Sequence, residues 1–377
     1  MRTVDTPCRI ELFRDVVQHL MQTPTYRQSF WASTWTLIDR QMTITLRNKK
    51  FLRARALMVV LGGLIYGTTF FQVDLANVQV TLGIVYQTAI FLSVGQASEI
   101  PAFVAAREIY YKQRRANFYR TSSFVIAYLA AAAPVIIGES IVFGSLVYWM
   151  CGFVAEIGPF VVFLLGMMLS SMALSSSFVV LSALSANLDV AQPVSTLSNV
   201  LFSVFAGFVV PMGQIPGYFS WLYWVNPVAW CLRAVIVSQY RSSSFDVCID
   251  SGENYCERFN STLGEYLLSQ YDVPSKEEWV WGGMAYLVLA ILVFVAAGTH
   301  FLEHKRFDQA RREQRLATRG SVAHAVRYWG DPRPSVASTS ESKSSNAKRS
   351  PKKKERKLHL QLEQQGSNAL AAAEAWW

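Results

Sequence analysis

The segment VQVTLGIVYQTAIFLSVGQAS, residues 78–98, contains no Asp, Glu, Lys or Arg. A helix of about 20 apolar residues crosses the hydrocarbon core of a bilayer, so this segment predicts a membrane span. The rest of the chain has a similar composition, since 52% of its 377 residues are hydrophobic and only 16% are charged. We therefore expect an all-α polytopic membrane protein.

Six segments of this kind occur in the sequence, and six transmembrane helices are predicted. Five of them lack Asp, Glu, Lys and Arg altogether, and the third contains only Glu139. None begins near Met1 or ends at a small-residue cleavage site, so we expect no cleaved signal peptide. The predicted spans are residues 56–73, 78–98, 124–149, 159–187, 190–210 and 279–298.

Basic residues in the short flanks of the spans predict the orientation, because cytoplasmic loops are enriched in Lys and Arg. Such residues gather in segments 40–55, 107–120 and 305–312, whereas segments 74–77 and 152–158 contain none. With six spans, both termini are then expected in the cytoplasm and segment 211–278 outside.

Segment 211–278 carries two further marks of an exofacial loop. It holds the sequence Asn260-Ser261-Thr262, a glycosylation sequon, and the cysteines Cys248 and Cys256. In an oxidising compartment these cysteines are close enough in sequence to form a disulfide, although they could also stay reduced. The first part, QIPGYFSWLYWVNPVAWCL, is too apolar for a solvated loop and is expected to re-enter the outer face of the membrane.

Residues 30–48 are expected to form an amphipathic helix along the membrane interface, before the first span. Its apolar positions recur at helical spacing: Trp31, Trp35, Ile38, Met42 and Leu46. The helix either anchors the chain or also docks a partner.

The basic segment AREIYYKQRRANFYRTSS, residues 106–123, is read as a loop between spans two and three. The positive-inside rule alone explains its charge, and a partner site is the alternative.

Glu139 lies near the middle of the third predicted span, where an unpaired carboxylate is costly. It is interpreted either as part of a proton relay or as a buried hydrogen-bonding group that holds helices together. The second interpretation is favoured because no other ionisable residue is expected deep in any span. No metal site is expected, because the spans lack His-rich and Cys-rich clusters.

The segment FAGFVVPMGQIPGYFSWLYWVNPVAWCLRAVIVSQY, residues 205–240, is the most distinctive part of the sequence. With the preceding helix, spans and REIYYKQRRANFYR segment, it resembles the transmembrane domain of the pleiotropic drug resistance group of G-subfamily ABC transporters. The amino-acid sequence of this region is most similar to the versions found in oomycetes. The resemblance covers residues 29–308 and implies an ABC-2 type transmembrane domain of the plasma membrane, an α-helical exporter pore whose ATP is hydrolysed by separate cytoplasmic domains.

The pentapeptide LSVGQ, residues 92–96, differs by one residue from LSGGQ, the ATP-clamping signature of ABC nucleotide-binding subunits. It lies inside an uncharged span, however, and the chain contains no GxxxxGK[ST] phosphate-binding loop. We therefore expect no enzyme activity and no cofactor in this chain itself, with ATP and Mg bound by partner nucleotide-binding domains. Only 28 residues precede the resemblance, which predicts a lone or truncated permease half.

The resemblance also implies roles for individual residues. The interfacial helix and segment 107–115 would dock on the nucleotide-binding domain, and many relatives carry an acidic residue where Gln113 stands. The contact residues are predicted to be Arg107, Lys112, Gln113 and Arg114.

The substrate path would lie between spans two and five of two copies or two halves. It would be lined by Phe91, Val94, Ser98, Thr196, Asn199, Val200, Ser203 and Phe208, with Phe208 and Val209 as an apolar gate. Ordinary helix packing is the alternative for each.

These features together predict the permease part of an ATP-driven exporter of amphipathic compounds or xenobiotics, working as a homodimer or with a half-transporter. The alternative is an orphan membrane protein that serves as an assembly partner or scaffold. Residues 1–28 form an N-terminal segment, and residues 309–377 are predicted to be a disordered basic tail. Its PKKKERK cluster either binds anionic lipid or is solvated, and nucleic-acid binding is not expected.

Overall fold

The computed structural model describes residues 26, 29–75, 77–250, 253–254, 256, 261–269 and 273–305. All of these belong to one compact unit, Met1–Arg315. The predicted basic tail, the predicted glycosylation site Asn260 and nearly all of the predicted N-terminal segment lie outside the described residues.

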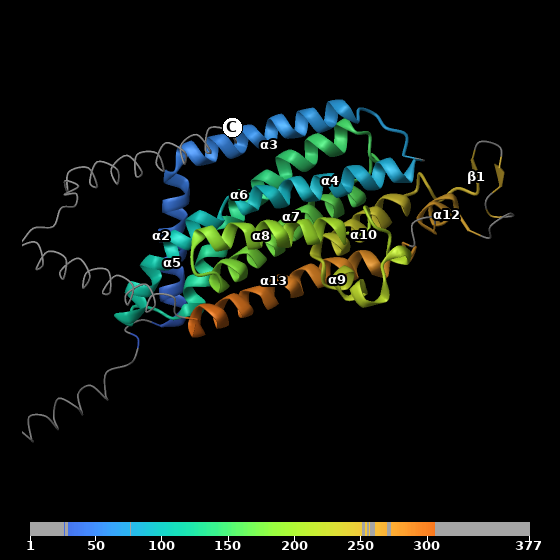
Figure 1. The fold of residues 1–377 in the computed structure, drawn as a ribbon. Helices are drawn as coiled ribbons and strands as arrows, with labels where there is room; N and C mark the ends of the chain where they lie inside the picture. The colour runs from blue at the N-terminus through green and yellow to red at the C-terminus, as the bar shows by residue number, and fades with distance from the viewer. Residues whose placement is uncertain are drawn as a thin grey trace, which may run out of the picture. The chain divides into compact units, whose positions relative to one another are not determined.

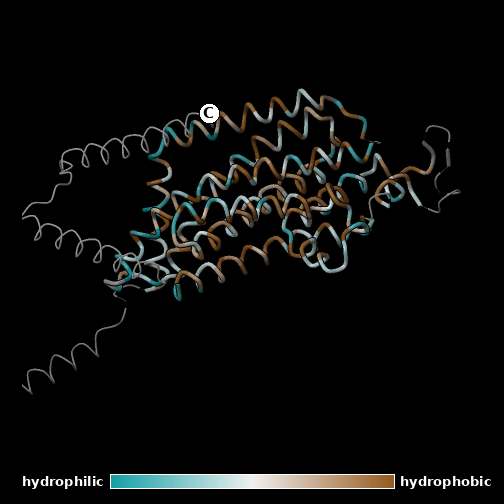
Figure 2. The backbone as a smooth tube through the Cα atoms, in the orientation of Figure 1, coloured by the Kyte–Doolittle hydropathy of each residue, from teal (hydrophilic) through white to brown (hydrophobic). Residues whose placement is uncertain are grey.

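Long helices lie side by side and form the body of this unit (Figure 1). They are α3 (Lys49–Thr69), α4 (Val78–Ala97), α6 (Thr121–Met150), α7 (Ile157–Leu184), α8 (Leu188–Val204) and α13 (Glu278–His304). In the described part of the chain, five segments are long and apolar enough to cross a membrane: Lys49–Thr69, Val78–Arg114, Thr121–Met150, Ile157–Leu184 and Glu278–His304. Figure 2 shows α13 as hydrophobic along most of its length. The predicted all-α membrane fold is confirmed.

The segment predicted as the fifth span is helical but shorter than expected. Helix α8 has 17 residues, ends at Val204 and contains Pro193. The chain then turns through Gly207, whose φ of 94° is in the left-handed region that favours glycine. A Cβ at Gly207 would also lie only 2.9 Å from the Tyr223 ring, so the turn packs directly against that side chain. Hydropathy alone extended this predicted span to residue 210.

A helix occupies the segment that was predicted to lie along the membrane interface. Helix α2 (Phe30–Arg47) runs across the ends of the long helices and packs against α6 (Figure 1). Leu37 is buried, whereas Trp31 and Trp35 are largely exposed. We call this part of the molecule, where α2 lies, the α2 end of the bundle.

The basic segment between the second and third predicted spans is not a loop, and that expectation is wrong. Helix α5 (Ile100–Arg115) begins two residues after α4, with Pro101 in its first turn, and continues to Arg115. Pro is well tolerated in a first helical turn because its missing N–H has no partner there. One side of α5 is buried through Phe103 and Tyr110. The charged residues Glu108 and Lys112 lie on the exposed side of this helix, whereas Arg107 is buried.

Opposite the α2 end lies the segment that was predicted to be exofacial, which we call the α10 end. It contains η1 (Met212–Gln214), η2 (Gly217–Phe219), α9 (Ser220–Val225), α10 (Pro227–Tyr240), β1 (Ile249–Asp250), β2 (Glu253–Asn254) and α12 (Leu263–Ser269). The strands pair antiparallel. Helix α10 is too short to span a bilayer, yet it is buried among α13, α7 and α4.

The start of α10 is fixed by the Asn226-Pro227 pair. The Asn226 side-chain oxygen accepts a hydrogen bond from the Val228 N–H, and its Nδ2 donates to the carbonyl of Phe202 at 2.6 Å. The first contact caps α10, and the second ties it to α8. This arrangement gives the Asn-Pro dipeptide a physical role at this position.

Helices α10 and α13 approach each other closely at Gly283. A Cβ there would lie 2.8 Å from the Ala234 Cβ and 3.0 Å from the Trp230 carbonyl oxygen, both on α10. Neither atom can move without shifting the α10 backbone. The neighbouring Gly282 has open space where its Cβ would stand.

We expect Gly283→Ala to destabilise the protein by roughly 1–3 kcal/mol, because the added methyl forces α13 away from α10. The matched variant Gly282→Ala should leave stability unchanged or slightly raised. Thermal unfolding of the two variants in detergent, compared with the unaltered protein, measures the difference. Equal midpoints for the two variants would contradict this packing.

Candidate functional site

Arg55, in the second turn of α3, is the centre of a buried ionic cluster. Its Nε and Nη2 each donate to one carboxylate oxygen of Glu139 on α6, both at 2.6 Å. Its Nη1 donates to Glu99, between α4 and α5, at 2.9 Å. Gln96 on α4 accepts from Nη2 at 3.1 Å and donates to Glu139 at 3.3 Å. One guanidinium therefore connects α3, the α4–α5 junction and α6.

The cluster lies in a region where charge is costly. Arg55 and Glu139 are both 8% exposed. A charged side chain at the centre of a bilayer costs at least about 2.5–3.5 kcal/mol, so such residues pair within the protein. The two parallel N–H···O bonds between Arg55 and Glu139 are the strong, bidentate kind. These contacts offset the loss of hydration only while all of the partners remain in place.

No other ionisable residue was expected deep in any span, but Arg55 of α3 pairs with Glu139, and Glu99 pairs with Arg55. The structure matches the interpretation of Glu139 as a group that holds helices together. Arg55 was assigned to the basic flank, since the predicted first span began at Ala56. The helix begins at Lys49, however, which places Arg55 inside it.

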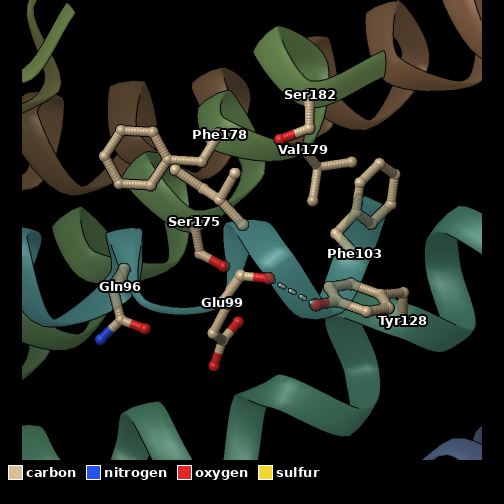
Figure 3. A pocket seen from close by; sticks show the side chains of 9 residues that line it. Gln96, Glu99, Phe103, Tyr128, Ser175, Phe178, Val179 and Ser182 are labelled. Atoms are coloured by element: carbon tan, nitrogen blue, oxygen red, sulfur yellow. Dashed lines mark hydrogen bonds between the residues drawn. The ribbon is translucent and has the colours of Figure 1, made fainter. Parts of the chain in front are cut away.

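A small cavity adjoins the cluster (Figure 3). Its walls are Gln96, Glu99, Ile100, Phe103, Tyr128, Ser175, Phe178, Val179 and Ser182. Figure 3 shows the Gln96 and Glu99 side chains on one side, away from Phe178, and the Tyr128 hydroxyl donating to the Glu99 carbonyl, a 3.2 Å bond. The cavity has room for about one water molecule. Drug-sized ligands occupy pockets of roughly 300–1,000 Å³, so this cavity is not a site for them.

Arg107, which was predicted to contact a nucleotide-binding domain, has a different role in the structure. It is 2% exposed and donates to the carbonyls of Ser182, Ser185 and Ala186, all within 3.0 Å. The last carbonyls of a helix have no partner within that helix, so a cation there satisfies them. Arg107 therefore caps α7 and is removed from the set of predicted docking contacts.

The other three predicted contact residues lie near the end of α5. Lys112 is exposed. Gln113 accepts hydrogen bonds from Arg40 on α2 at 3.2 Å and from the Tyr119 hydroxyl at 2.6 Å. Burial raises the pKa of Tyr119 above its ordinary value, although Arg40 nearby opposes the shift, so the phenol stays a neutral donor. Gln113 thus joins α5 to α2.

Arg114 ties the same end of α5 to α13. Its Nη2 lies 3.1 Å from a carboxylate oxygen of Glu303, and its Nη1 donates to the Glu303 carbonyl and to the Tyr110 hydroxyl, both at 3.3 Å. Of the four predicted docking residues, Lys112 alone has an exposed side chain and no described role within the bundle. It is the member of the set that is available to a partner.

The predicted path residues fall into two groups. Val94, Ser98, Thr196, Val200 and Val209 are exposed. Helices α4 and α8 pack against each other. We call five of the exposed side chains on these helices and at the end of α4, namely Val94, Ser98, Thr196, Leu197 and Val200, the α4–α8 face. Val94 and Val200 are about half exposed, at 50% and 51%.

The remaining path residues are turned into the bundle. Phe91 stacks on Phe143 of α6 with ring centroids 4.4 Å apart. Phe208 stacks on Tyr86 at 4.9 Å, and the Tyr86 hydroxyl is hydrogen-bonded to Ser203. Asn199 is partly buried. In this conformation the packing alternative describes Phe91, Ser203 and Phe208. Phe208 nevertheless lies beside the exposed Val209, at the exit of α8, where the gate was predicted.

At the α10 end, Cys248 and Cys256 are joined by a disulfide. Cys151 and Cys231 are free and buried, and burial raises the pKa of the Cys151 thiol to about 11. Within the described residues, no group of three or more His, Cys, Asp and Glu side chains could hold a metal ion.

We expect Arg55→Met to destabilise the protein by about 3–5 kcal/mol, because it leaves the carboxylates of Glu139 and Glu99 without their cation. Glu139→Gln should cost clearly less, since Arg55 keeps its ion pair with Glu99. Unfolding in mixed detergent micelles measures both variants. A loss for Glu139→Gln that equals or exceeds that for Arg55→Met would contradict the shared-cation arrangement.

Comparison with known proteins agrees with this architecture. Residues 32–240 match the family model for ABC-2 type transporters. Among curated proteins, ABC transporter G family member 2 of Dictyostelium discoideum is 24% identical over 70% of this chain and 21% of its own length. Pleiotropic drug resistance protein 1 of Nicotiana tabacum is 29% identical over 57% of the chain and 15% of its own. ABC transporter G family member 36 of Arabidopsis thaliana is 24% identical over 72% and 18%.

The chain spans only about a fifth or less of the length of these relatives. The family model covers more than half of the chain, from α2 to the last residue of α10. The helices that match are those that carry the Arg55 cluster, the α4–α8 face and the buried helix α10. The chain therefore belongs to the ABC-2 type transporter family, as a transmembrane domain with homologues among G-family and pleiotropic drug resistance transporters.

Proposed function

We propose that the chain is the permease part of an ATP-driven exporter of amphipathic compounds or xenobiotics. The observation that carries the proposal is the exposure of the α4–α8 face, which includes apolar Val94, Leu197 and Val200 and the hydroxyl-bearing Ser98 and Thr196. Such a surface offers dispersion and a few weak hydrogen bonds, which suit varied ligands bound without strict specificity. The name of the tobacco relative refers to drug resistance, which supports this substrate class.

ATP hydrolysis belongs, in this proposal, to a nucleotide-binding domain outside the sequence. The chain has no GxxxxGK[ST] segment, so its own residues do not fit the phosphates of ATP or their Mg²⁺. The partner domain would dock at the α2 end, on the cytoplasmic side of the plasma membrane, where the exposed Lys112 lies. A second copy or a half-transporter would complete the path along the α4–α8 face.

The experiment uses inside-out vesicles from cells that co-express the chain and a nucleotide-binding domain. A fluorescent amphipathic dye is added to the medium outside the vesicles. We expect ATP-dependent, vanadate-sensitive uptake of the dye. Val200→Trp should abolish most of this uptake, because the indole fills the path beside α8. The matched control is Val288→Trp on α13, which replaces a similarly exposed valine at 46% and should leave transport intact.

Two results would oppose the proposal. A stable membrane protein that neither binds a nucleotide-binding domain nor moves the dye would indicate an orphan assembly partner or scaffold instead. Equal transport by Val200→Trp and the unaltered protein would remove the α4–α8 face from the path.

Lys112 provides a separate test of docking. We expect Lys112→Glu to lower dye transport and stimulated ATP hydrolysis several-fold while the thermal midpoint stays unchanged, because this side chain is exposed and reversing its charge repels the partner surface. Lys50→Glu, an exposed basic residue in the first turn of α3, is the matched control. If Lys50→Glu impairs coupling as much as Lys112→Glu, the effect is one of general charge and the specific contact is refuted.

A further inference from the structure

Arg233, in the middle of α10, is surrounded by aromatic rings. Its guanidinium carbon lies between 4.8 and 5.1 Å from the ring centroids of Tyr223, Trp224, Trp230 and Trp279. The side chain is buried, with 5% of its surface exposed, and Nη2 donates to the Tyr223 hydroxyl. The aromatic cage holds the guanidinium in one position.

This cation lacks a counterion in the part of the chain that the structure describes. None of the ion pairs formed there includes Arg233. Its Nη1 is buried and has no hydrogen-bond acceptor among the described residues. Each cation–π contact contributes about 0.5–2 kcal/mol. An unsatisfied donor on a charged group, however, costs more than the 1–3 kcal/mol of a neutral one. The cage therefore offsets only part of the cost of burying the charge and leaves Nη1 without an acceptor among the described residues.

A cavity lies beside the guanidinium. Its walls are Leu82, Ala206, Gly207, Met212, Tyr223, Ala229, Leu232, Arg233 and Val273. None of the described lining residues carries a carboxylate, and Arg233 is the only cation among those described. The cavity has room for one or two water molecules, and most of its lining side chains are apolar.

We propose that this cavity binds one weakly hydrated monovalent anion of halide size, held by the charge of the Arg233 guanidinium. A water molecule in the cavity would leave the charge without a counterion, whereas an anion supplies one. The described lining side chains offer few hydrogen-bond donors, so the cavity cannot replace the tight hydration shell of an ion such as fluoride. The size of the cavity excludes tetrahedral oxyanions.

The position of the cavity gives the anion a structural effect. Ala206 and Gly207 belong to the turn that follows α8, and Arg233 belongs to α10. An anion between them holds the exit of α8 against α10, next to Phe208. This inference does not depend on the proposed export function, because the site exists within one chain.

The test measures thermal unfolding of the purified full chain in detergent at constant ionic strength, in sodium fluoride, chloride or bromide. We expect the midpoint to be higher in bromide and chloride than in fluoride, by about 2–4 °C, and to saturate as bromide is titrated. Arg233→Gln should remove this difference. The matched control, Arg241→Gln, changes an exposed arginine that follows α10 and should keep it.

Three outcomes would overturn the proposal. The midpoint of the unaltered protein could be the same in all three salts, which would indicate water in the cavity. The midpoint could rise with bromide without saturating, and by the same amount in Arg233→Gln, which would indicate a general salt effect. Asp272, next to Val273 in sequence, lies outside the described residues. The midpoint could be independent of halide in the unaltered protein and become dependent on it in Asp272→Asn. That result would identify the Asp272 carboxylate as the counterion. If Arg233→Gln does not fold, the bromide titration of the unaltered protein decides the question.

Discussion

A guanidinium among apolar membrane helices has to be paired inside the protein, and the arrangement around Arg55 follows from that requirement. Helix α3 exposes most of its apolar surface and contacts the bundle mainly through α6. Near its start it is attached by the bond to Glu139. Further along it is attached by close approach, because a Cβ at Gly63 would lie 2.9 Å from Leu146 and one at Gly67 would lie 2.6 Å from Met150. The polar contacts of Arg55 and these close approaches at small residues thus help to set the position of α3.

The same principle organises the α2 end, where α5 holds several helices together. Gln113 connects it to α2, Arg114 to α13 and Arg107 to the last carbonyls of α7. At its first residue it meets Glu99, a member of the Arg55 cluster. A force applied at the exposed Lys112 would therefore act on four neighbouring helices through polar contacts. In the proposed permease, these contacts would pass the movement of a docked nucleotide-binding domain to the bundle.

Much of the fold could be predicted from the sequence because the membrane imposes a simple pattern. Uncharged segments of about 20 residues located the long helices, and residues 205–240 identified the family. The same hydropathy rule failed where a helix contains charged residues. The basic residues of α5 were read as a loop, and Arg55 was excluded from the first span. Hydropathy also could not detect that the turn at Gly207 shortens α8.

The pairing of side chains could not be predicted from the sequence, for a different reason. Arg55 and Glu139 are 84 positions apart, and only the packing of α3 on α6 brings them together. The direction of Phe91, toward Phe143 and away from the α4–α8 face, depends on the rotation of α4 about its axis, which a helix hydrophobic on all sides does not specify. The aromatic residues around Arg233 were visible as a cluster in sequence, whereas their closure around one cation required the fold.

The most direct test of the Arg55 cluster as the link between α3 and α6 is a double-mutant cycle. Arg55→Met, Glu139→Leu and the double variant would be compared by reversible unfolding in mixed micelles. We expect the double variant to recover most of the stability lost by Arg55→Met alone, with a coupling free energy of about 1.5 kcal/mol or more. Additive losses, with a coupling energy near zero, would contradict the account, because the two side chains would then act independently.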